Sequence, residues 1–279
     1  MTNRPSSIRN LAWAVVGDGA EPRHVYRRNV DLFLKDGRIV EITPAGARPA
    51  EANEPALDGG GMLALPGLIN IHSHPTTEPG YRGVREDHGV PEQQMTGLIE
   101  RLQAFRLDKD GQSAAAVMSY SEMLRAGTTT ACDVTVPFDG WLDTMVQSGM
   151  RFYAGPTFAS ARWGMSAPQT VTWRWDEAAG LAAFDTAKAV MAEAESHNSG
   201  RLGALVFPAQ IDTVTPELFA SARRHADESG RLFSTHIGQA VVEVREMIRR
   251  HGTTPVQWAA AQGLLKSDTI LAHCILLDE

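Results

Sequence analysis

The chain has 279 residues, of which 43% are hydrophobic and 21% are charged, and its formal net charge is −7. This length suits one large domain or two smaller ones, and the composition is that of an ordinary globular protein. The acidic balance and scattered basic residues argue against a nucleic-acid partner, and no run of about 18 apolar residues provides a membrane span. Two cysteines do not make a disulfide framework, so we expect a cytoplasmic protein.

The first 62 residues differ in pattern from the rest of the chain. Residues 8–60 contain short apolar runs separated by turns, which is typical of strands rather than helices. Asp36-Gly37 predicts a hairpin turn, because both residues adopt positive φ at low cost. We interpret residues 1–62 as the N-terminal part of a small β-sandwich, too short to bury much apolar surface alone.

From residue 63 onward, buried strands alternate with amphipathic helices. The pattern predicts strands at 66–72, 128–134, 151–158, 202–208, 231–236 and 269–273. Helices are predicted at 112–126, 139–148, 177–197, 216–229 and 240–263, with a break at Pro255. Thr215-Pro216 is a good helix start, and Gly127 and Gly230 suit left-handed positions after helices.

Repeated β-α units without a dinucleotide-binding glycine pattern favour an α/β fold of the (β/α)8 TIM-barrel type. A complete barrel has eight strands, and the sequence provides about six. We therefore expect residues 63–279 to form an incomplete barrel that ends after the sixth strand, as the first part of a longer protein.

Histidines occur at three of the predicted strand ends. His72 and His74 end the first barrel strand in LPGLINIHSHP, His236 ends the fifth in LFSTHIGQ, and His273 ends the sixth in ILAHC. Residues i and i+2 of a strand lie on one face, so His72 and His74 both point into the barrel mouth. A lone buried histidine is usually a satisfied core residue, but four histidines at one barrel mouth indicate a metal site.

The motif PGLINIHSHP resembles the first-strand motif of the amidohydrolase superfamily. The resemblance continues through LRAGTTTACDV, TPELFASARRHADESGRLFSTHIGQ and LAHCILLD, and it is greatest to the branch that contains chlorohydrolases and aminohydrolases. Members of this branch include S-adenosylhomocysteine, cytosine and guanine deaminases and triazine hydrolases.

The resemblance implies a hydrolase with one divalent metal ion, held by His72, His74 and His236. It implies that His273 orients or polarises the substrate. The fourth strand, RLGALVFP, lacks the lysine that bridges two metals in binuclear members, which favours one ion. We expect Zn²⁺, with Fe²⁺, Mn²⁺ and Co²⁺ left open because imidazole binds all of them.

The chain departs from the family pattern at three places. Deaminases carry a glutamate three residues after the fifth-strand histidine, where this chain has Gln239, which cannot transfer a proton as a carboxylic acid does. Glu243, four residues further on, is a candidate catalytic substitute, or else a solvated or salt-bridged helix residue. Ala209 occupies the place of a histidine common in nucleoside deaminases, and the eighth-strand aspartate is absent.

Other side chains are weaker candidates for contact with the substrate. The polar loop after the first barrel strand could line a pocket; its candidates are Glu78, Arg82, Arg85, Glu86 and His88. Trp163 could form part of a pocket wall or pack a long loop. Asp133, at the end of the second barrel strand, could face the barrel mouth or bind a neighbouring loop.

The sequence thus predicts a metal-dependent hydrolase of non-peptide C–N bonds, acting by deamination of a cyclic or heteroaromatic amine or amidine. A dechlorinase or an amide or carbamate hydrolase is the alternative within the family, since Gln239 disfavours a leaving group that must be protonated. A non-catalytic fragment that needs a partner chain is the alternative from another class. We expect a small-molecule substrate, no nucleic-acid or membrane partner, and an oligomeric state that could be a homo-oligomer.

Overall fold

The computed structural model describes residues 5–17, 23–49, 54–82 and 91–278. The chain falls into two compact units, Met1–Gly67 and Leu68–Glu279. The division lies a few residues after the boundary expected at residue 62, because β5 (Leu63–Ala64) pairs with the first strand of the chain.

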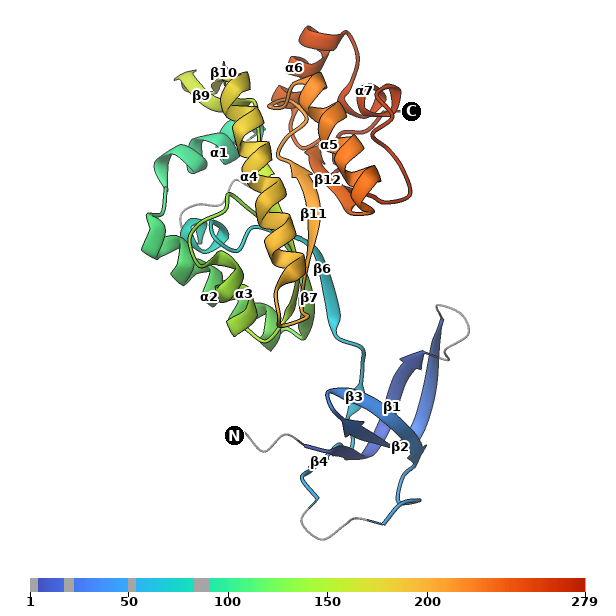
Figure 1. Cartoon of the computed structure of the whole chain (residues 1–279). Helices are drawn as coiled ribbons and strands as arrows, with labels where there is room; N and C mark the ends of the chain where they lie inside the picture. The colour runs from blue at the N-terminus through green and yellow to red at the C-terminus, as the bar shows by residue number, and fades with distance from the viewer. Residues whose placement is uncertain (1–4, 18–22, 50–53, 83–90, 279) are drawn as a thin grey trace. The chain divides into compact units, whose positions relative to one another are not determined.

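The first unit is built around one curved sheet. Its strands are β1 (Ser7–Gly17), β2 (His24–Lys35), β3 (Arg38–Pro44) and β4 (Ala56–Asp58), in the order β3-β2-β1-β4 (Figure 1). The predicted hairpin turn is confirmed, because β2 pairs antiparallel with β3 and Asp36 and Gly37 have φ of 51° and 75°. Asp and Gly tolerate such values, which match the twist of a tight hairpin.

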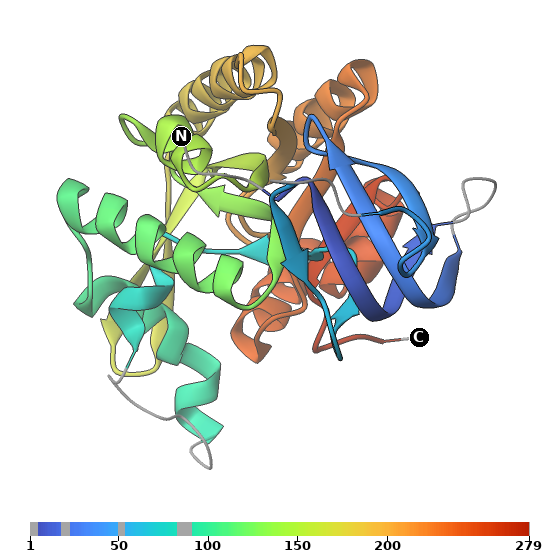
Figure 2. The ribbon, with the colours of Figure 1, turned by 90° about the horizontal axis from the view of Figure 1, so that it is seen from below.

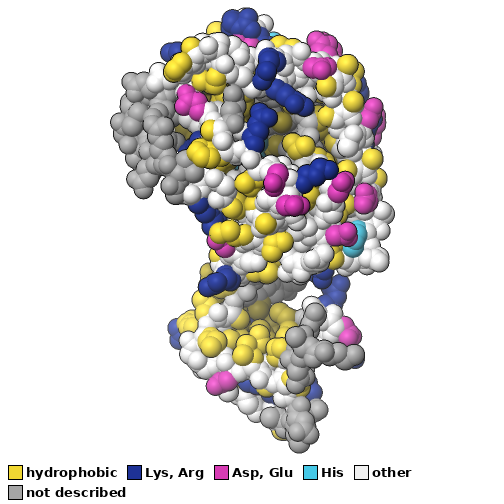
Figure 3. Space-filling view, turned by 90° about the vertical axis from the view of Figure 1, so that its left-hand side faces the viewer, with side chains coloured by type: hydrophobic (Ala, Val, Ile, Leu, Met, Phe, Trp, Pro, Cys, Tyr) yellow, Lys and Arg dark blue, Asp and Glu magenta, His cyan; other side chains and the backbone are white. Residues whose placement is uncertain are grey.

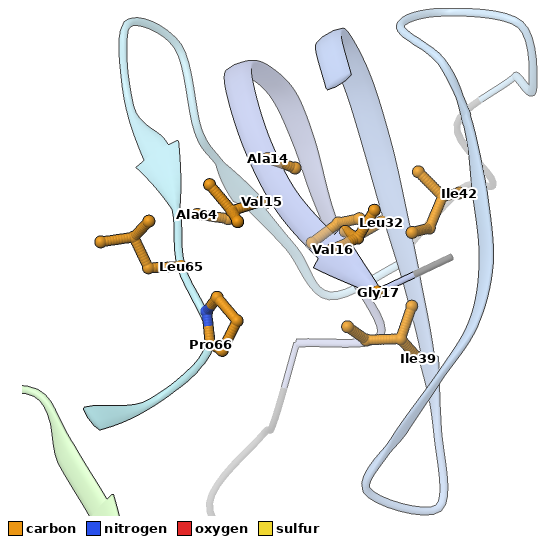
Figure 4. A pocket seen from close by; sticks show the side chains of 10 residues that line it. All are labelled: Ala14, Val15, Val16, Gly17, Leu32, Ile39, Ile42, Ala64, Leu65 and Pro66. Carbon is orange, nitrogen blue, oxygen red and sulfur yellow. The ribbon is translucent and has the colours of Figure 1, made fainter. Parts of the chain in front are cut away.

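This unit has a small core and an open apolar hollow. The core residues are Leu11, Ala14, Val30 and Leu32. The hollow has a volume of about 370 Å³ and is lined only by apolar side chains and one glycine, the residues labelled in Figure 4. Figure 3 shows hydrophobic side chains gathered on the face of this unit that is in view. A hollow without polar groups can bind apolar surface but cannot perform acid, base or metal chemistry.

The second unit contains six parallel strands in chain order. They are β6 (Leu68–Ser73), β7 (Thr128–Thr135), β8 (Arg151–Phe158), β11 (Leu202–Pro208), β12 (Leu232–Ile237) and β13 (Thr269–His273). Each pairs in parallel with the next. All six predicted strands, and with them the incomplete α/β barrel of the amidohydrolase kind, are confirmed.

Helical segments connect the strands of this unit. They are η1 (Glu78–Tyr81), α1 (Pro91–Ala104), α2 (Lys109–Arg125), α3 (Trp141–Gln147), α4 (Glu177–Ser196), α5 (Pro216–Ser229), α6 (Val241–His251) and α7 (Pro255–Ala261). Helix α4 packs against β8 and β11, and α5 packs against β11 and β12. Figure 2 shows the helices of this unit arranged around the strands. Among the described helices, none is long and apolar enough to cross a bilayer.

The predicted helix boundaries rest on identifiable local chemistry. Thr215 accepts a hydrogen bond from the Leu218 backbone N–H, and Pro216 is the first residue of α5. Gly230 ends this helix with φ of 68°. The expected break before Pro255 is also present, because α6 ends at His251 and α7 begins at the proline.

The helices η1 and α1 and one hairpin were not predicted from the sequence. The stretch between β8 and α4, which reads as a long loop, forms the antiparallel hairpin β9 (Ala161–Ala167) and β10 (Thr170–Trp175). Trp163 pairs with Trp173 across this hairpin. Large aromatic side chains favour strands, so the tryptophans carried a strand signal that the polar residues between them obscured.

Candidate metal centre

The C-terminal ends of β6 and β12 bring three imidazoles together. The Nε2 atom of His72 lies 3.1 Å from that of His74, which lies 3.0 Å from that of His236. The third side of the triangle, from His236 Nε2 to His72 Nε2, measures 3.2 Å. These three residues, which the sequence predicts as metal ligands, form the group of donors in the described chain that could hold a metal ion.

Backbone carbonyl groups fix which nitrogen of two of these rings faces inward. His74 Nδ1 lies 3.2 Å from the Val134 carbonyl oxygen, and His236 Nδ1 lies 2.6 Å from the Ala209 carbonyl oxygen. A carbonyl only accepts, so Nδ1 carries the proton in both rings and Nε2 presents a lone pair. Metal-binding histidines are commonly oriented in this way.

Burial keeps the three rings neutral. Burial, with the charges of His74 and His273, lowers the pKa of His72 to about 4. Burial likewise lowers the pKa of His74 to about 4 and that of His236 well below its ordinary value. Neutral imidazole is the form that binds metal ions, so all three rings are in the ligand form near neutral pH.

The donor set fits a divalent cation. His74 and His236 direct two lone pairs at each other with no proton between them, an arrangement that is unfavourable unless a positive charge lies between them. His72 Nδ1 is also buried without a hydrogen-bond partner among the described residues. Three ligands of a tetrahedral Zn²⁺ at about 2.1 Å are about 3.4 Å apart, close to the observed spacings.

His273 stands beside this cluster without joining it. Its ring stacks on His236 with centroids 5.2 Å apart, and it meets the ring of His72 edge-on at 5.9 Å. His72 and His273 belong to the two edge strands β6 and β13, so their contact shows that the sheet curls as a barrel wall does. His273 and Cys274 have φ of 76° and 50°, so the strand ends here and Cys274 packs on the outer core.

A cavity of about 680 Å³ opens at this end of the strands. It is lined by the four histidines, by polar residues that include Glu78, Arg82, Gln112, Gln210 and Gln239, and by apolar residues that include Leu98, Leu102 and Met123. Arg82 Nη2 is 2.6 Å from Glu78 Oε2, and its Nη1 is 2.6 Å from Glu122 Oε1. The lining of the cavity thus combines histidines, an ion-paired arginine and apolar side chains.

Glu243 does not line the cavity. Its side chain is buried, and its Oε1 accepts a hydrogen bond from the Gly238 N–H at 2.6 Å. Its Oε2 accepts a longer bond of 3.3 Å from the Gln239 N–H. Burial and the charge of Asp212 raise the pKa of Glu243 to about 8. The carboxyl group therefore fixes the backbone of the loop that carries Gln239.

Trp163 is likewise absent from the cavity lining. Its indole N–H donates to Asp212 Oδ2 at 2.9 Å, and the indole N–H of Trp173 donates to the same oxygen at 2.8 Å. Burial raises the pKa of Asp212. The two tryptophans thus tie the β9–β10 hairpin to the segment after β11, which sequence reasoning did not anticipate.

Asp133 faces the helices rather than the cavity. It is fully buried and accepts hydrogen bonds from Tyr120 Oη at 2.5 Å, Thr135 Oγ1 at 2.6 Å and Trp141 Nε1 at 3.0 Å. The remaining loop candidates Arg85, Glu86 and His88 lie outside the described residues. Gln210 is a cavity residue that sequence reasoning missed, although its place just after a barrel strand was a usable signal.

Comparison with known proteins agrees with this architecture. The sequence model of the Amidohydrolase family matches residues 63–279. The chain is 30% identical over 253 residues to a 5-methylthioadenosine/S-adenosylhomocysteine deaminase of Nitratidesulfovibrio vulgaris, covering 89% of this chain and 53% of the relative. It is 25% identical over 252 residues to a 5'-deoxyadenosine deaminase of Methanothermobacter thermautotrophicus, covering 90% and 55%. The chain therefore spans about half the length of these curated relatives.

Solved structures share the fold at lower sequence identity. The atrazine chlorohydrolase TrzN from Arthrobacter aurescens TC1, complexed with zinc, matches with a TM-score of 0.74 and 20% identity, covering 98% of this chain and 61% of that one. An adenosine deaminase from Xanthomonas campestris with bound zinc matches with a TM-score of 0.70 and 20% identity, covering 96% and 58%.

Proposed function

The chain belongs to the amidohydrolase family, and we propose that it carries the metal site of a hydrolase that cleaves non-peptide C–N bonds. The substrate class is a cyclic or heteroaromatic amine or amidine, and the reaction is hydrolytic deamination. One observation carries the proposal: three neutral imidazoles converge within 3.0–3.2 Å at the edge of a cavity of about 680 Å³. The deaminases among the curated relatives support it.

His72, His74 and His236 would hold one divalent ion, and Zn²⁺ is the ion we propose. All three are nitrogen ligands, which suit zinc, and the zinc in two structural neighbours supports the same choice. When bound in such a site, a divalent ion supplies Lewis acidity, which makes a hydroxide nucleophile available near neutral pH.

His273 would orient the substrate and stabilise charge that develops on it. Its ring lies against His236 and His72 at the cavity, and no hydrogen bond within the described chain occupies it. Burial lowers the pKa of His273, which favours the neutral imidazole at neutral pH. A neutral imidazole can donate a hydrogen bond, as an electrophilic group next to a reacting carbon must.

Other residues that line the cavity would accommodate the rest of the substrate. Leu98, Leu102 and Met123 offer apolar surface against which a flat ring can pack. Arg82 lies between Glu78 and Glu122, so its charge is compensated and it is available mainly as an oriented hydrogen-bond donor. Glu243 would act as a positioning residue through the loop of Gln239, and Trp163 would act through Asp212 rather than on the substrate.

A second reaction within the family is favoured by one observation. Gln239 lines the cavity where a carboxylic acid would be needed to protonate an amine that leaves. Chloride leaves without a proton, so hydrolytic dechlorination needs no such acid. Hydrolysis of an amide or a carbamate is the third candidate reaction for this site.

A hydrolysis screen with metal analysis tests the proposal. The protein would be loaded with zinc and assayed against amino- and chloro-heterocycles, amides and carbamates. Ammonia and chloride release distinguish the reactions, and His236→Ala is the control in each case. We expect zinc-dependent turnover that His236→Ala abolishes. Zinc binding without turnover of any substrate class would instead support the non-catalytic alternative.

A further inference from the structure

Two glutamine side chains meet beside the metal ligand His236. Gln239 Nε2 donates a hydrogen bond to Gln210 Oε1 at 3.2 Å, and both residues line the cavity. Gln210 follows β11 and forms a parallel bridge with His236. The residue before it, Ala209, accepts the Nδ1–H of the same histidine. The glutamine pair is therefore held next to the proposed metal ligand by backbone contacts.

The loop that carries Gln239 is fixed from two sides. Glu243 accepts hydrogen bonds from the N–H groups of Gly238 and Gln239. The Gly238 carbonyl accepts from the N–H groups of Ile275 and Leu276 after β13. Gly238 has φ of +66°, and a Cβ atom there would lie 2.9 Å from the Leu276 carbonyl oxygen. Only glycine fits this turn, so Gln239 enters the cavity from a defined backbone position.

The hydrogen bond between the two amides decides which atom each one presents. Gln210 uses its oxygen to accept from Gln239, and its Nε2 has no hydrogen-bond partner among the described residues. Gln239 donates through its amino group, and its Oε1 is buried without a partner among the described residues. The Gln210 amino group is therefore without a hydrogen-bond partner at the cavity among the described residues.

We propose that Gln210 binds the substrate by donating this N–H to an acceptor, and that Gln239 is the positioning residue that holds the Gln210 amide in this sense. The proposal rests on the proposed hydrolase function and narrows its substrate class. It selects heterocycles that present an unprotonated ring nitrogen or a carbonyl oxygen toward Gln210. In this positioning role, Gln239 needs only its amide group and transfers no proton.

Two different substitutions should change the group that the glutamine pair presents to the cavity from a hydrogen-bond donor to an acceptor. In Gln210→Glu, the new carboxylate still accepts from Gln239 but presents oxygen to the cavity. In Gln239→Glu, the new carboxylate can only accept, so Gln210 must turn its amino group toward it and present its own oxygen. If the pair acts as a unit, both variants therefore make this change from donor to acceptor.

The test uses two probes that share a phenyl ring. N,N-dimethylbenzamide offers an acceptor and no N–H group, whereas benzamidinium offers N–H donors and no acceptor. Dissociation constants for both would be measured by calorimetry on each protein, with the zinc content of each sample determined. Gln112→Glu is the matched control, because Gln112 lines the same cavity and makes no hydrogen bond to the pair. It adds the same charge without touching the two glutamines.

We expect the wild-type chain to prefer N,N-dimethylbenzamide. Gln210→Glu and Gln239→Glu should each shift the ratio of dissociation constants toward benzamidinium by about tenfold or more, and Gln112→Glu by less than about threefold. The inference is overturned if only one of the two glutamine variants shifts the ratio, if Gln112→Glu shifts it equally, or if neither probe binds. A chain that shows both shifts but holds no zinc retains the inference and loses the proposed function. If the chain holds zinc and hydrolyses substrate but the two glutamine variants leave the ratio of dissociation constants unchanged, the proposed function stands and the inference fails.

Discussion

Two buried polar clusters in the barrel unit differ in how their hydrogen-bonding groups are satisfied. Asp133 is fully buried, and three donors from Tyr120, Thr135 and Trp141 surround its carboxylate. His72, His74 and His236 instead direct three Nε2 atoms at one another. The first cluster is complete within the protein, whereas the second requires a cation to bring its lone pairs together.

This difference distinguishes a cluster that stabilises the fold from a cluster that can bind an ion or a ligand. A buried polar group normally finds its partners inside the fold, and a group that does not must gain them from a ligand or an ion. The strand-end position alone does not distinguish the two clusters, because Asp133 also lies near the end of a barrel strand, β7. The two clusters differ in how many hydrogen-bond partners their groups lack within the protein. The predictions below test this distinction, beginning with the largest expected effect.

Removal of two histidines should abolish metal binding. We expect His72→Ala combined with His74→Ala to reduce zinc from about one ion per chain to none, because one imidazole alone cannot hold the ion. Elemental analysis after dialysis measures this. His24→Ala, an exposed histidine of the first unit, is the control and should leave zinc unchanged. Stoichiometric zinc in the double variant would remove these residues from the ligand set.

Removal of the Asp133 carboxylate should damage the fold and spare the metal. Asp133→Ala leaves three donors buried without an acceptor, so we expect the free energy of unfolding to fall by about 3 kcal/mol or more. Urea unfolding followed by tryptophan fluorescence measures the change. Zinc content should stay at the wild-type level in the folded variant. A loss of zinc with unchanged stability would place Asp133 in the metal site instead.

Asp133 should also give the stability a pH dependence. Burial raises the pKa of this carboxyl group to about 6, from an ordinary value of 3.8. The folded chain therefore holds the proton more tightly than the unfolded chain does. The contribution of Asp133 to stability is greatest below about pH 4, falls as the pH rises to about 6, and is constant above that. The total decrease is about 3 kcal/mol.

Asp133→Asn cannot ionise and should lack this decrease. The difference in unfolding free energy between wild type and variant, measured in urea at several pH values from 4 to 7 on metal-free protein, isolates the Asp133 contribution. A difference that stays constant across this range would show that burial does not raise the pKa of the group.

The smallest expected effect concerns Gln239, which has features of both kinds of cluster. Its side chain lines the cavity, and its backbone is held by a buried structural carboxylate, Glu243. Gln239→Glu should add an ionisation with an apparent pKa between about 4 and 7 to the profile of kcat/KM against pH. Superimposable profiles for wild type and variant would mean that the side chain at position 239 does not face the reacting substrate.

The sequence predicted the barrel strands and the direction of His72 and His74 because both follow from short-range periodicity. Alternation along β6 places the two rings on one face whatever the rest of the chain does. The rule that barrel strands end at the same rim then predicted a metal site among the four histidines, and the resemblance to the amidohydrolase superfamily implied which three of them are ligands. These features depend on local geometry that the order of residues already contains.

The surroundings of the site could not be predicted in the same way. The i+4 spacing of Gln239 and Glu243 suggested a shared helical face, but α6 begins only at Val241 and Ala240 before it is extended, so Gln239 lies outside the helix. Trp163 meets Asp212 only because the β9–β10 hairpin folds against the segment after β11. Such contacts join residues about 50 positions apart, and no periodicity in the sequence reports them.

The central claim is that three histidines hold one metal ion, and anomalous diffraction at the zinc edge from crystals of the zinc-loaded chain tests it most directly. We expect one strong peak within about 2.0–2.1 Å of the Nε2 atoms of His72, His74 and His236. A peak bonded to other residues, or no peak near these three nitrogens, would contradict the account.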